Sequence, residues 1–182
     1  MTIHERNRDG IDCDEVFPNL VLGNGCTVKK KDYLKRIGIT HILNAAEYRG
    51  VNVGRDYFNQ IGDKFKYLGF RIEDTPQTQI CRYFTFFFRP KKKSSKLFFL
   101  RYFVDAAEFI EDAILNNGKV FVNCVFGKSR STTFVVAYMM LCHNYDALTA
   151  LKQIREKRDV QINNGFLLQL VDLDYRLKWL RT

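Results

Sequence analysis

Residues 120–132 read VFVNCVFGKSRST, and this stretch decides the fold. An apolar run at 120–122 predicts a buried strand, and residues 131–142 are apolar nearly all round, which predicts a buried central helix. Between the two lies a loop that begins with Cys124, contains Gly127 and ends with Arg130. A buried strand that passes through a short loop into a buried helix is typical of an α/β domain.

The rest of the chain alternates strand and helix patterns. Strands are predicted at 16–17, 20–23, 41–46, 66–70 and 120–122. Helices are predicted at 28–37, 102–114, 131–142, 148–154 and 166–180, with Thr27 and Asn163-Asn164 as N-terminal caps. Because strands that alternate with helices form largely parallel sheets, we expect an α/β fold with a central, mostly parallel (mixed) sheet of about five strands flanked by helices.

The chain has 182 residues, of which 46% are hydrophobic, and this suffices for one globular domain with a real core. We expect an N-terminal tail at 1–12 and one domain at 13–182. The net charge of +9 is concentrated in one segment, because residues 82–100 hold six Lys or Arg and no Asp or Glu. Without those six cations the net charge falls to +3, so we expect no nucleic-acid partner.

The basic segment at 82–100 also interrupts a regular pattern. Arg-Tyr-Phe occurs at 82–84 and again at 101–103, and only the second copy continues into an amphipathic helix. We therefore interpret 82–100 as a basic, aromatic insertion. Three hypotheses stay open: contact with an anionic membrane or phosphoinositide, a patch for localisation or for an acidic partner, and a solvated segment without a function of its own. The last is favoured because charge runs are usually solvated.

Cysteine usage bears on the compartment. Five cysteines without a C-x-x-C pair follow a polar and charged start at 1–10, which predicts a reducing environment and no disulfide scaffold. We expect a cytoplasmic protein, with the nucleus as a further compartment. The apolar runs are too short to span a membrane. The three histidines lie far apart in the sequence, so we expect no metal and no other cofactor.

The 124–130 loop has the chemistry of an anion site. Free amides at a helix N-terminus point at one spot, and the helix dipole favours negative charge there. The guanidinium of Arg130 matches two phosphate oxygens, Cys124 can attack phosphorus as a thiolate, and Ser131 can donate a hydrogen bond to the sulfur. The residues whose amides can wrap around the phosphate are Val125, Phe126, Gly127, Lys128, Ser129 and Arg130.

Two other interpretations of this loop are weaker. Gly127-Lys128-Ser129 ends like a Walker A loop, but that motif needs glycine at position 122, where this chain has Val122. A lone cysteine is most often a buried structural residue. The strand, the glycine, the arginine and the helix around Cys124 favour a phosphate site instead.

VNCVFGKSRST resembles the Cys-x5-Arg motif of cysteine-based protein tyrosine phosphatases, and more closely the H-C-x-x-G-x-S-R-S form of their dual-specificity branch. Segments at 15–24, 38–47, 67–75 and 163–177 also fall in the family's order. The resemblance covers nearly everything from residue 13 to residue 180 except the insertion. The chain is therefore similar to the small, atypical members that consist of the catalytic domain alone, and the resemblance implies a protein tyrosine phosphatase-like fold.

The resemblance also implies a function. A member of this family hydrolyses phosphotyrosine through a phosphocysteine intermediate, and phosphoserine and phosphothreonine stay open as further substrates. The partner would be a phosphoprotein, for example a signalling kinase. The family's general acid is an aspartate on a loop after a strand, and Asp74 occupies that place, with its neighbour Glu73 as the rival. Such an acid protonates the leaving oxygen and then activates water.

One position departs from the family's pattern, because the family has histidine directly before the cysteine and this chain has Asn123. Asparagine carries no charge, so we expect a smaller thiolate fraction at Cys124 and slower turnover at acidic to neutral pH. Two alternatives therefore stay open: a catalytically impaired pseudophosphatase that binds phosphorylated partners, and a phosphatase acting on phosphoinositide or RNA. Lipid-directed relatives tend to carry two lysines in the loop, whereas here Lys128 is alone.

Overall fold

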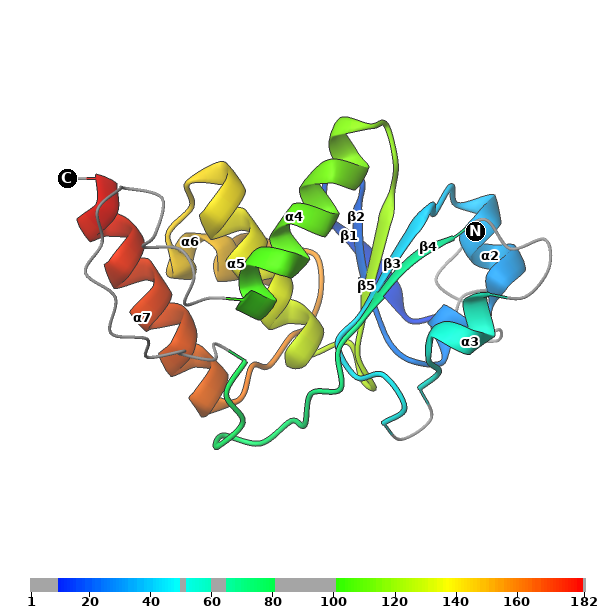
Figure 1. Cartoon of the computed structure of the whole chain (residues 1–182), viewed down its shortest axis with the longest axis horizontal. Helices are drawn as coiled ribbons and strands as arrows, with labels where there is room; N and C mark the ends of the chain where they lie inside the picture. The colour runs from blue at the N-terminus through cyan, green and yellow to red at the C-terminus, as the bar shows by residue number, and fades with distance from the viewer. Residues whose placement is uncertain (1–9, 50–51, 60–64, 81–100, 182) are drawn as a thin grey trace.

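The computed structural model describes residues 10–49, 52–59, 65–80 and 101–181 (Figure 1). The insertion predicted at 82–100 lies outside these residues. Ile11 and Asp12, which the sequence assigned to the tail, belong to the folded part: Ile11 is buried, and Asp12 makes hydrogen bonds with residues far along the chain. None of the described helices is long and apolar enough to cross a membrane.

Five strands form one mixed sheet, as predicted, and their order is β1-β2-β5-β3-β4. The first two strands pair antiparallel, and Asn19 in the turn between them adopts a positive φ of 59°. The other neighbouring pairs are all parallel. The bounds are β1 Cys13–Phe17, β2 Leu20–Gly23, β3 His41–Asn44, β4 Lys66–Gly69 and β5 Val120–Asn123.

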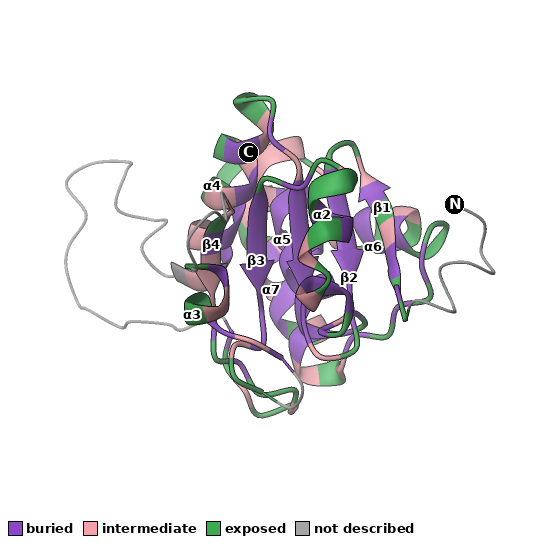
Figure 2. Cartoon of the chain, turned by 90° about the vertical axis from the view of Figure 1, so that its right-hand side faces the viewer, coloured by how far each residue is buried: buried purple, intermediate pink, exposed green. Residues whose placement is uncertain are grey.

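Helices cover both faces of the sheet (Figure 1). One face carries α4 (Arg101–Leu115), α5 (Arg130–His143), α6 (Ala147–Arg155) and α7 (Asn164–Arg181), and the other carries η1 (Thr27–Lys29), α2 (Lys31–Arg36) and α3 (Arg55–Phe58). Strand side chains alternate between the two resulting cores, since Val120 and Val122 pack with the first group and Phe121 with the second. The three inner strands β2, β5 and β3 are accordingly buried from end to end, whereas the outer strands β1 and β4 are buried only in part (Figure 2).

The helix predicted at 28–37 is wrong in detail. The chain forms the short 3-10 turn η1 and then α2, separated by Lys30, whose ψ of 68° is not helical. Thr27 is not the N-terminal cap either. Its own amide and that of Cys26 donate to the Asn24 side chain, while its hydroxyl accepts a hydrogen bond from the amide of Asp12 at 2.8 Å. Thr27 therefore joins the start of the fold to η1.

The carboxyl ends of the parallel strands lie side by side at one end of the sheet. In the register, Gly23 and Asn44 both pair with Asn123, and Asn44 also pairs with Gly69. The loops that follow these strands therefore meet beyond the carboxyl ends of β2, β5, β3 and β4, which is where ligands bind in open α/β sheets. At the same end α7 begins, and its cap is as predicted, because Asn163 Oδ1 accepts a hydrogen bond from the amide of Phe166 at 2.9 Å.

Candidate active site

The 124–130 loop connects the end of β5 to the first residue of α5. It must reverse within a few residues, and Gly127 makes this turn with a φ of +66°. A Cβ atom at Gly127 would lie 2.6 Å from the carbonyl carbon and oxygen of Gly23. Position 127 therefore requires glycine on two counts, the left-handed backbone and the close approach of β2.

Cys124 lies at the base of this loop and is 1% exposed. Its Sγ accepts hydrogen bonds from the amide of Gly127 and from the hydroxyl of Ser131, each at 3.2 Å. The sulfur also lies beside the N-terminal turn of α5, which begins at Arg130. Two donors and a helix N-terminus directed at one sulfur suit a negatively charged thiolate. The predicted contact between Ser131 and Cys124 is present.

Arg130 is buried in the first turn of α5, and its side chain reaches towards the segment that follows β4. Its Nη1 donates to the carbonyl oxygen of Ile72 at 3.1 Å. Its Nε lies 3.4 Å from Oδ2 of Asp74 and makes no hydrogen bond of good geometry in the described part of the chain. The guanidinium therefore lies next to the loop with one buried N–H group available for an anion.

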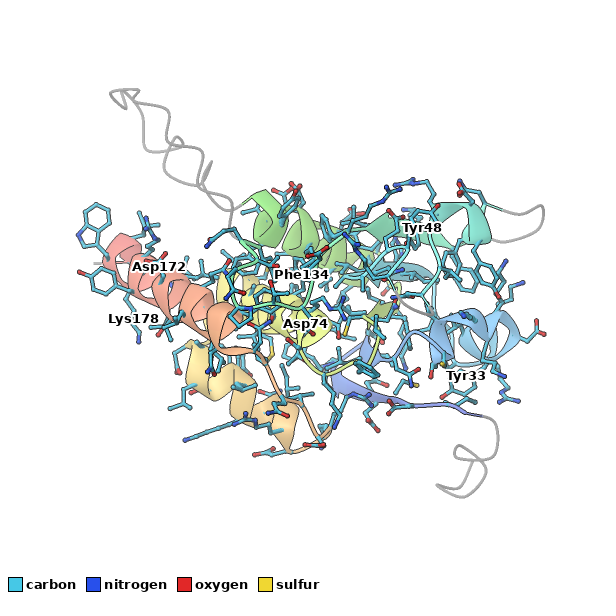
Figure 3. The ribbon with its side chains drawn as sticks, turned by 90° about the horizontal axis from the view of Figure 1, so that it is seen from below. Tyr33, Tyr48, Asp74, Phe134, Asp172 and Lys178 are labelled. Atoms are coloured by element: carbon cyan, nitrogen blue, oxygen red, sulfur yellow. The ribbon has the colours of Figure 1, made fainter. Side chains whose placement is uncertain are left out.

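Asp74 is held over the loop by side chains from two other segments. Its Oδ1 accepts hydrogen bonds from Ser129 Oγ and from Asn163 Nδ2, both at 2.7 Å. Figure 3 shows Asp74 in the middle of the molecule, well away from Tyr33 and Asp172 at the two ends. The sequence pointed to Ser129 only as a source of an amide and to Asn163 only as a cap. No sequence signal links either side chain to Asp74.

Glu73, the rival for the role of acid, points elsewhere. Its Oε1 lies 3.0 Å from Nη2 of Arg49, and both side chains are largely exposed. Adjacent residues in an extended segment project to opposite sides. When Asp74 faces the 124–130 loop, Glu73 therefore faces away from it.

The side chain of Lys128 does not lie with those of Cys124 and Arg130. Its Nζ lies 2.7 Å from Oδ2 of Asp159, and this ion pair at the surface holds the pKa of Asp159 below its usual value. Only the backbone of Lys128 belongs to the loop's anion-binding set. Phe126 is 70% exposed, and the carbonyl of Val125 accepts a hydrogen bond from the amide of Gly25 at 3.0 Å.

Asn123 belongs to a buried asparagine cluster, defined here as Asn44, Asn52 and Asn123. Asn123 Nδ2 donates to Oδ1 of Asn52 at 3.1 Å and to Oδ1 of Asn44 at 3.3 Å. Asn52 Nδ2 donates to Oδ1 of Asn44 at 2.8 Å. The Oδ1 of Asn123 is buried and accepts no hydrogen bond from the described residues. The group directly before Cys124 therefore sits in a network of neutral amides.

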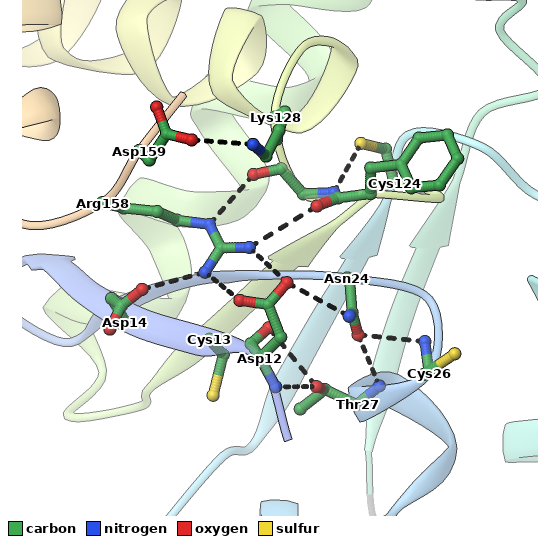
Figure 4. A network of polar contacts seen from close by, with 12 residues as sticks. Asp12, Cys13, Asp14, Asn24, Cys26, Thr27, Cys124, Lys128, Arg158 and Asp159 are labelled. Carbon is green, nitrogen blue, oxygen red and sulfur yellow. Dashed lines mark hydrogen bonds and ion pairs between the residues drawn. The ribbon is translucent and has the colours of Figure 1, made fainter. Parts of the chain in front are cut away.

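Arg158 supports the loop from behind, and sequence reasoning missed it (Figure 4). Its Nε donates to the carbonyl of Gly127 at 3.0 Å, and its two terminal nitrogens donate to Asp12 and Asp14 at 2.7–2.8 Å. Burial works against the charged form of Arg158. The hydrogen bonds to Asp12 and Asp14 outweigh that effect and hold its pKa above the ordinary value. Its partners lie 144 and 146 residues earlier, so no local pattern could reveal the pairing.

Residues 10–49, 52–59, 65–80 and 101–181 contain no group of three or more His, Cys, Asp or Glu side chains arranged to hold a metal ion. The site brings together the thiol of Cys124, the guanidinium of Arg130, the carboxyl group of Asp74 and the loop amides. These groups come from the loop after β5, the first residue of α5 and the segment after β4. Together they can bind a phosphate, attack it and exchange a proton with its leaving group.

Comparison with known proteins supports this chemistry. A family model, "Dual specificity phosphatase, catalytic domain", matches residues 20–176. Dual specificity protein phosphatase 26 of mouse is 35% identical over 166 residues, which are 91% of this chain and 68% of the relative, and the human protein gives the same values.

Two solved structures have a similar fold. DUSP15 is 28% identical with a TM-score of 0.70, over 93% of this chain and 92% of the other. Human tyrosine phosphatase-like serine/threonine/tyrosine-interacting protein is 27% identical with a TM-score of 0.71, over 93% of this chain and 98% of the other. The predicted protein tyrosine phosphatase-like fold is confirmed. The chain belongs to the dual-specificity phosphatases.

Proposed function

We propose that this dual-specificity phosphatase hydrolyses phosphoproteins through a covalent phosphate on Cys124. The thiolate attacks phosphorus and forms a P–S bond, the P–O bond to the substrate breaks, and Asp74 gives its proton to the departing oxygen. Water then attacks phosphorus and loses a proton to Asp74. The P–S bond breaks, and the hydroxyl of Ser131 stabilises the thiolate that returns.

One observation carries this proposal. The sulfur of Cys124 receives two hydrogen bonds from within its own loop, while the carboxylate of Asp74 is anchored to Ser129 of that loop. A nucleophile and a proton donor are thus fixed to the same short segment of backbone. Arg130 lies beside Asp74 and supplies a fork for the phosphate oxygens. A geometry fixed before substrate arrives is what covalent phosphoryl transfer needs.

The substrate that we propose is a phosphoprotein, with phosphotyrosine as the primary target and phosphoserine and phosphothreonine as further targets. A phosphorylated signalling kinase is the partner class that the family suggests. The pairing of Lys128 with Asp159 disfavours a phosphoinositide, because a polyphosphorylated headgroup needs cations that are free to meet its additional phosphates. An RNA phosphate has no supporting contact among the described residues.

A binding module without turnover is the second candidate, and the asparagine cluster favours it. Asn123 offers no charge next to Cys124, and its buried Oδ1 accepts no hydrogen bond within the described chain. Such a protein would still hold a phosphate on the amides of the 124–130 loop and on Arg130.

Hydrolysis of a small aryl phosphate by the parent and by Cys124→Ser distinguishes the two candidates. We expect the parent to release phosphate continuously and Cys124→Ser to release none, while both bind tungstate, a tetrahedral dianion that resembles phosphate. A phosphoenzyme trapped by acid quenching should form in the parent only. If the parent binds tungstate but does not hydrolyse the aryl phosphate, the binding module is the candidate that remains. Equal turnover by parent and variant would show that Cys124 is not the nucleophile.

A further inference from the structure

Arg158 contacts none of the groups that would react. Its guanidinium nevertheless lies next to the site and makes hydrogen bonds through all three of its nitrogens. Its side chain is 4% exposed, and its guanidinium contacts four partners (Figure 4). Two are carbonyls of the 124–130 loop: Gly127 O at 3.0 Å and Phe126 O at 3.5 Å. The other two are the carboxylates of Asp12 and Asp14. A buried arginine divided in this way between loop backbone and carboxylates has a role beyond neutralising charge.

The loop carbonyls that Arg158 holds determine where the loop amides point. In a planar trans peptide the C=O and the N–H of one unit point in opposite directions. Drawing Phe126 O towards Arg158 turns the amide of Gly127 the other way, and that amide donates to Cys124 Sγ at 3.2 Å. Drawing Gly127 O towards Arg158 likewise turns the amide of Lys128 away from Arg158 and onto the side of the loop where the sulfur lies.

Asp12 and Asp14 fix the guanidinium in turn. Asp12 accepts from both terminal nitrogens, at 2.7 and 2.8 Å, and Asp14 accepts from Nη1 at 2.8 Å. The geometry of the loop amides thereby depends on the segment at and before β1. Removing Arg158 would leave two carboxylates without their cation, whereas removing Asp14 would leave Arg158 paired with Asp12 through both terminal nitrogens.

We propose that Arg158 is a positioning residue of the phosphate-binding loop: it holds the carbonyls of Phe126 and Gly127 so that the opposite amides face the phosphate and the sulfur. The two contacts of Asp12 hold Arg158 in place, and Asp14 adds stability to this ion pair. The proposal rests on the proposed function only in naming phosphate as the ligand. It assigns to this chain a link between the strand that begins the fold and the anion site.

Three variants separate positioning from stability. Arg158→Lys keeps a charge for the carboxylates, but one ammonium cannot also hold both loop carbonyls in the fixed geometry of a guanidinium. Asp14→Asn weakens the ion pair but keeps both contacts of Asp12, which are sufficient to hold Arg158 and its two loop hydrogen bonds in place. Arg155→Met removes an exposed arginine three residues away on α6 and serves as the control for charge. Melting temperature is measured for all three.

The first readout is calorimetric titration with tungstate, which needs no turnover. We expect Arg158→Lys to bind tungstate about 10-fold more weakly and to lower kcat for an aryl phosphate by up to about 10²-fold, because misplacing preorganised donors by about 1 Å has effects of this size. Asp14→Asn should lower the melting temperature and leave tungstate affinity within about twofold, since the loop bonds remain. Arg155→Met should match the parent in both measurements.

The second readout is alkylation of Cys124 by iodoacetamide as a function of pH. Turning the Gly127 amide away from the sulfur should shift alkylation to higher pH in Arg158→Lys and in neither of the other two variants.

The proposal is overturned if tungstate affinity follows melting temperature across the variants, or if Arg158→Lys binds tungstate like the parent. It is supported if affinity and the alkylation profile change in Arg158→Lys alone. A parent that binds tungstate without hydrolysing aryl phosphate would overturn the proposed turnover and leave the test of Arg158 intact.

Discussion

Replacing Asp74 with asparagine removes the proton of the carboxyl group that lies over the 124–130 loop and leaves most of its contacts. The amide oxygen of asparagine can still accept the hydrogen bonds from Ser129 and Asn163, which are now 2.7 Å long. The contact with Arg130 at 3.4 Å loses its ionic character. We therefore expect a folded protein whose defect is chemical.

The expected loss follows from the role of a positioned acid. General acid–base groups contribute about 10²- to 10⁴-fold in rate, which corresponds to about 2.7–5.4 kcal/mol of transition-state stabilisation at 1.36 kcal/mol per tenfold. The loss depends on the leaving group. A phenol with a pKa of about 10, like the tyrosine side chain, needs the proton as it departs, whereas p-nitrophenolate is a much weaker base and departs without it.

The assay compares kcat/KM for phenyl phosphate and for p-nitrophenyl phosphate in the parent, in Asp74→Asn and in Glu73→Gln. Glu73→Gln is the matched control, because it removes the adjacent carboxylate, whose partner Arg49 is about half exposed. An exposed ion pair is worth about 0–1 kcal/mol of stability, so this control should keep parental rates on both substrates.

Asp74→Asn should lose more activity on phenyl phosphate than on p-nitrophenyl phosphate. Equal losses on the two substrates would mean that Asp74 does not protonate the leaving group. An equal or larger loss in Glu73→Gln would transfer the role to Glu73 and refute the reasoning from side-chain direction.

Three further outcomes are expected. Gly127→Ala should be destabilised and lose tungstate binding, because its Cβ would lie 2.6 Å from Gly23. Gly10→Ala is the control: its φ is also positive, but no heavy atom lies within 4 Å of the added Cβ, so urea unfolding should show only the backbone penalty of about 1–2 kcal/mol. Equal losses of stability in the two would contradict the steric argument. Asn123→His should raise kcat/KM at acidic to neutral pH, and a pH–rate profile identical to the parent's would show that Asn123 does not limit activity. Burial lowers the pKa of His41, so its contribution to the free energy of unfolding is present above the ordinary histidine pKa and should be lost as pH drops below that value, by no more than about 1.4 kcal/mol per pH unit. His41→Phe should remove this part of the pH dependence of urea unfolding. An unchanged pH dependence in the variant would disprove the contribution of His41.

The order of elements around Cys124 was predictable because it depends on local patterns. An apolar run followed by a polar loop and an apolar helix forms a strand–loop–helix unit whose loop lies at the carboxyl end of a parallel sheet. The same locality made the contact between Ser131 and Cys124 predictable, since both residues lie at the two ends of one short loop. Helix boundaries were less accessible. The amides of Cys26 and Thr27 donate to Asn24, which itself donates to Asp12, and these partners lie outside the helix pattern.

Side-chain direction was the main quantity that sequence patterns could not supply. Asp74 and Glu73 are neighbours of similar chemistry, and they face opposite ways because one meets Ser129 and Asn163 while the other meets Arg49. Lys128 lies in the middle of the phosphate motif, yet its side chain pairs with Asp159. Each of these choices depends on a partner from a different part of the chain.

The sequence was sufficient for the fold class and for the position of the loop from Cys124 to Arg130, because periodicity and the Cys-to-Arg spacing are encoded over a few residues. The contacts that support this loop could not be predicted from the sequence. Arg158 bonds to carboxylates 144 and 146 residues earlier. The asparagine cluster joins the last residues of β3 and β5 to Asn52 in a loop. Contacts across such distances exist only after the chain has folded, since they depend on sheet order and register. For this protein the contacts between the segment of Asp12 and Asp14, the loop after β5 and Arg158 after α6 determine how the 124–130 loop is held.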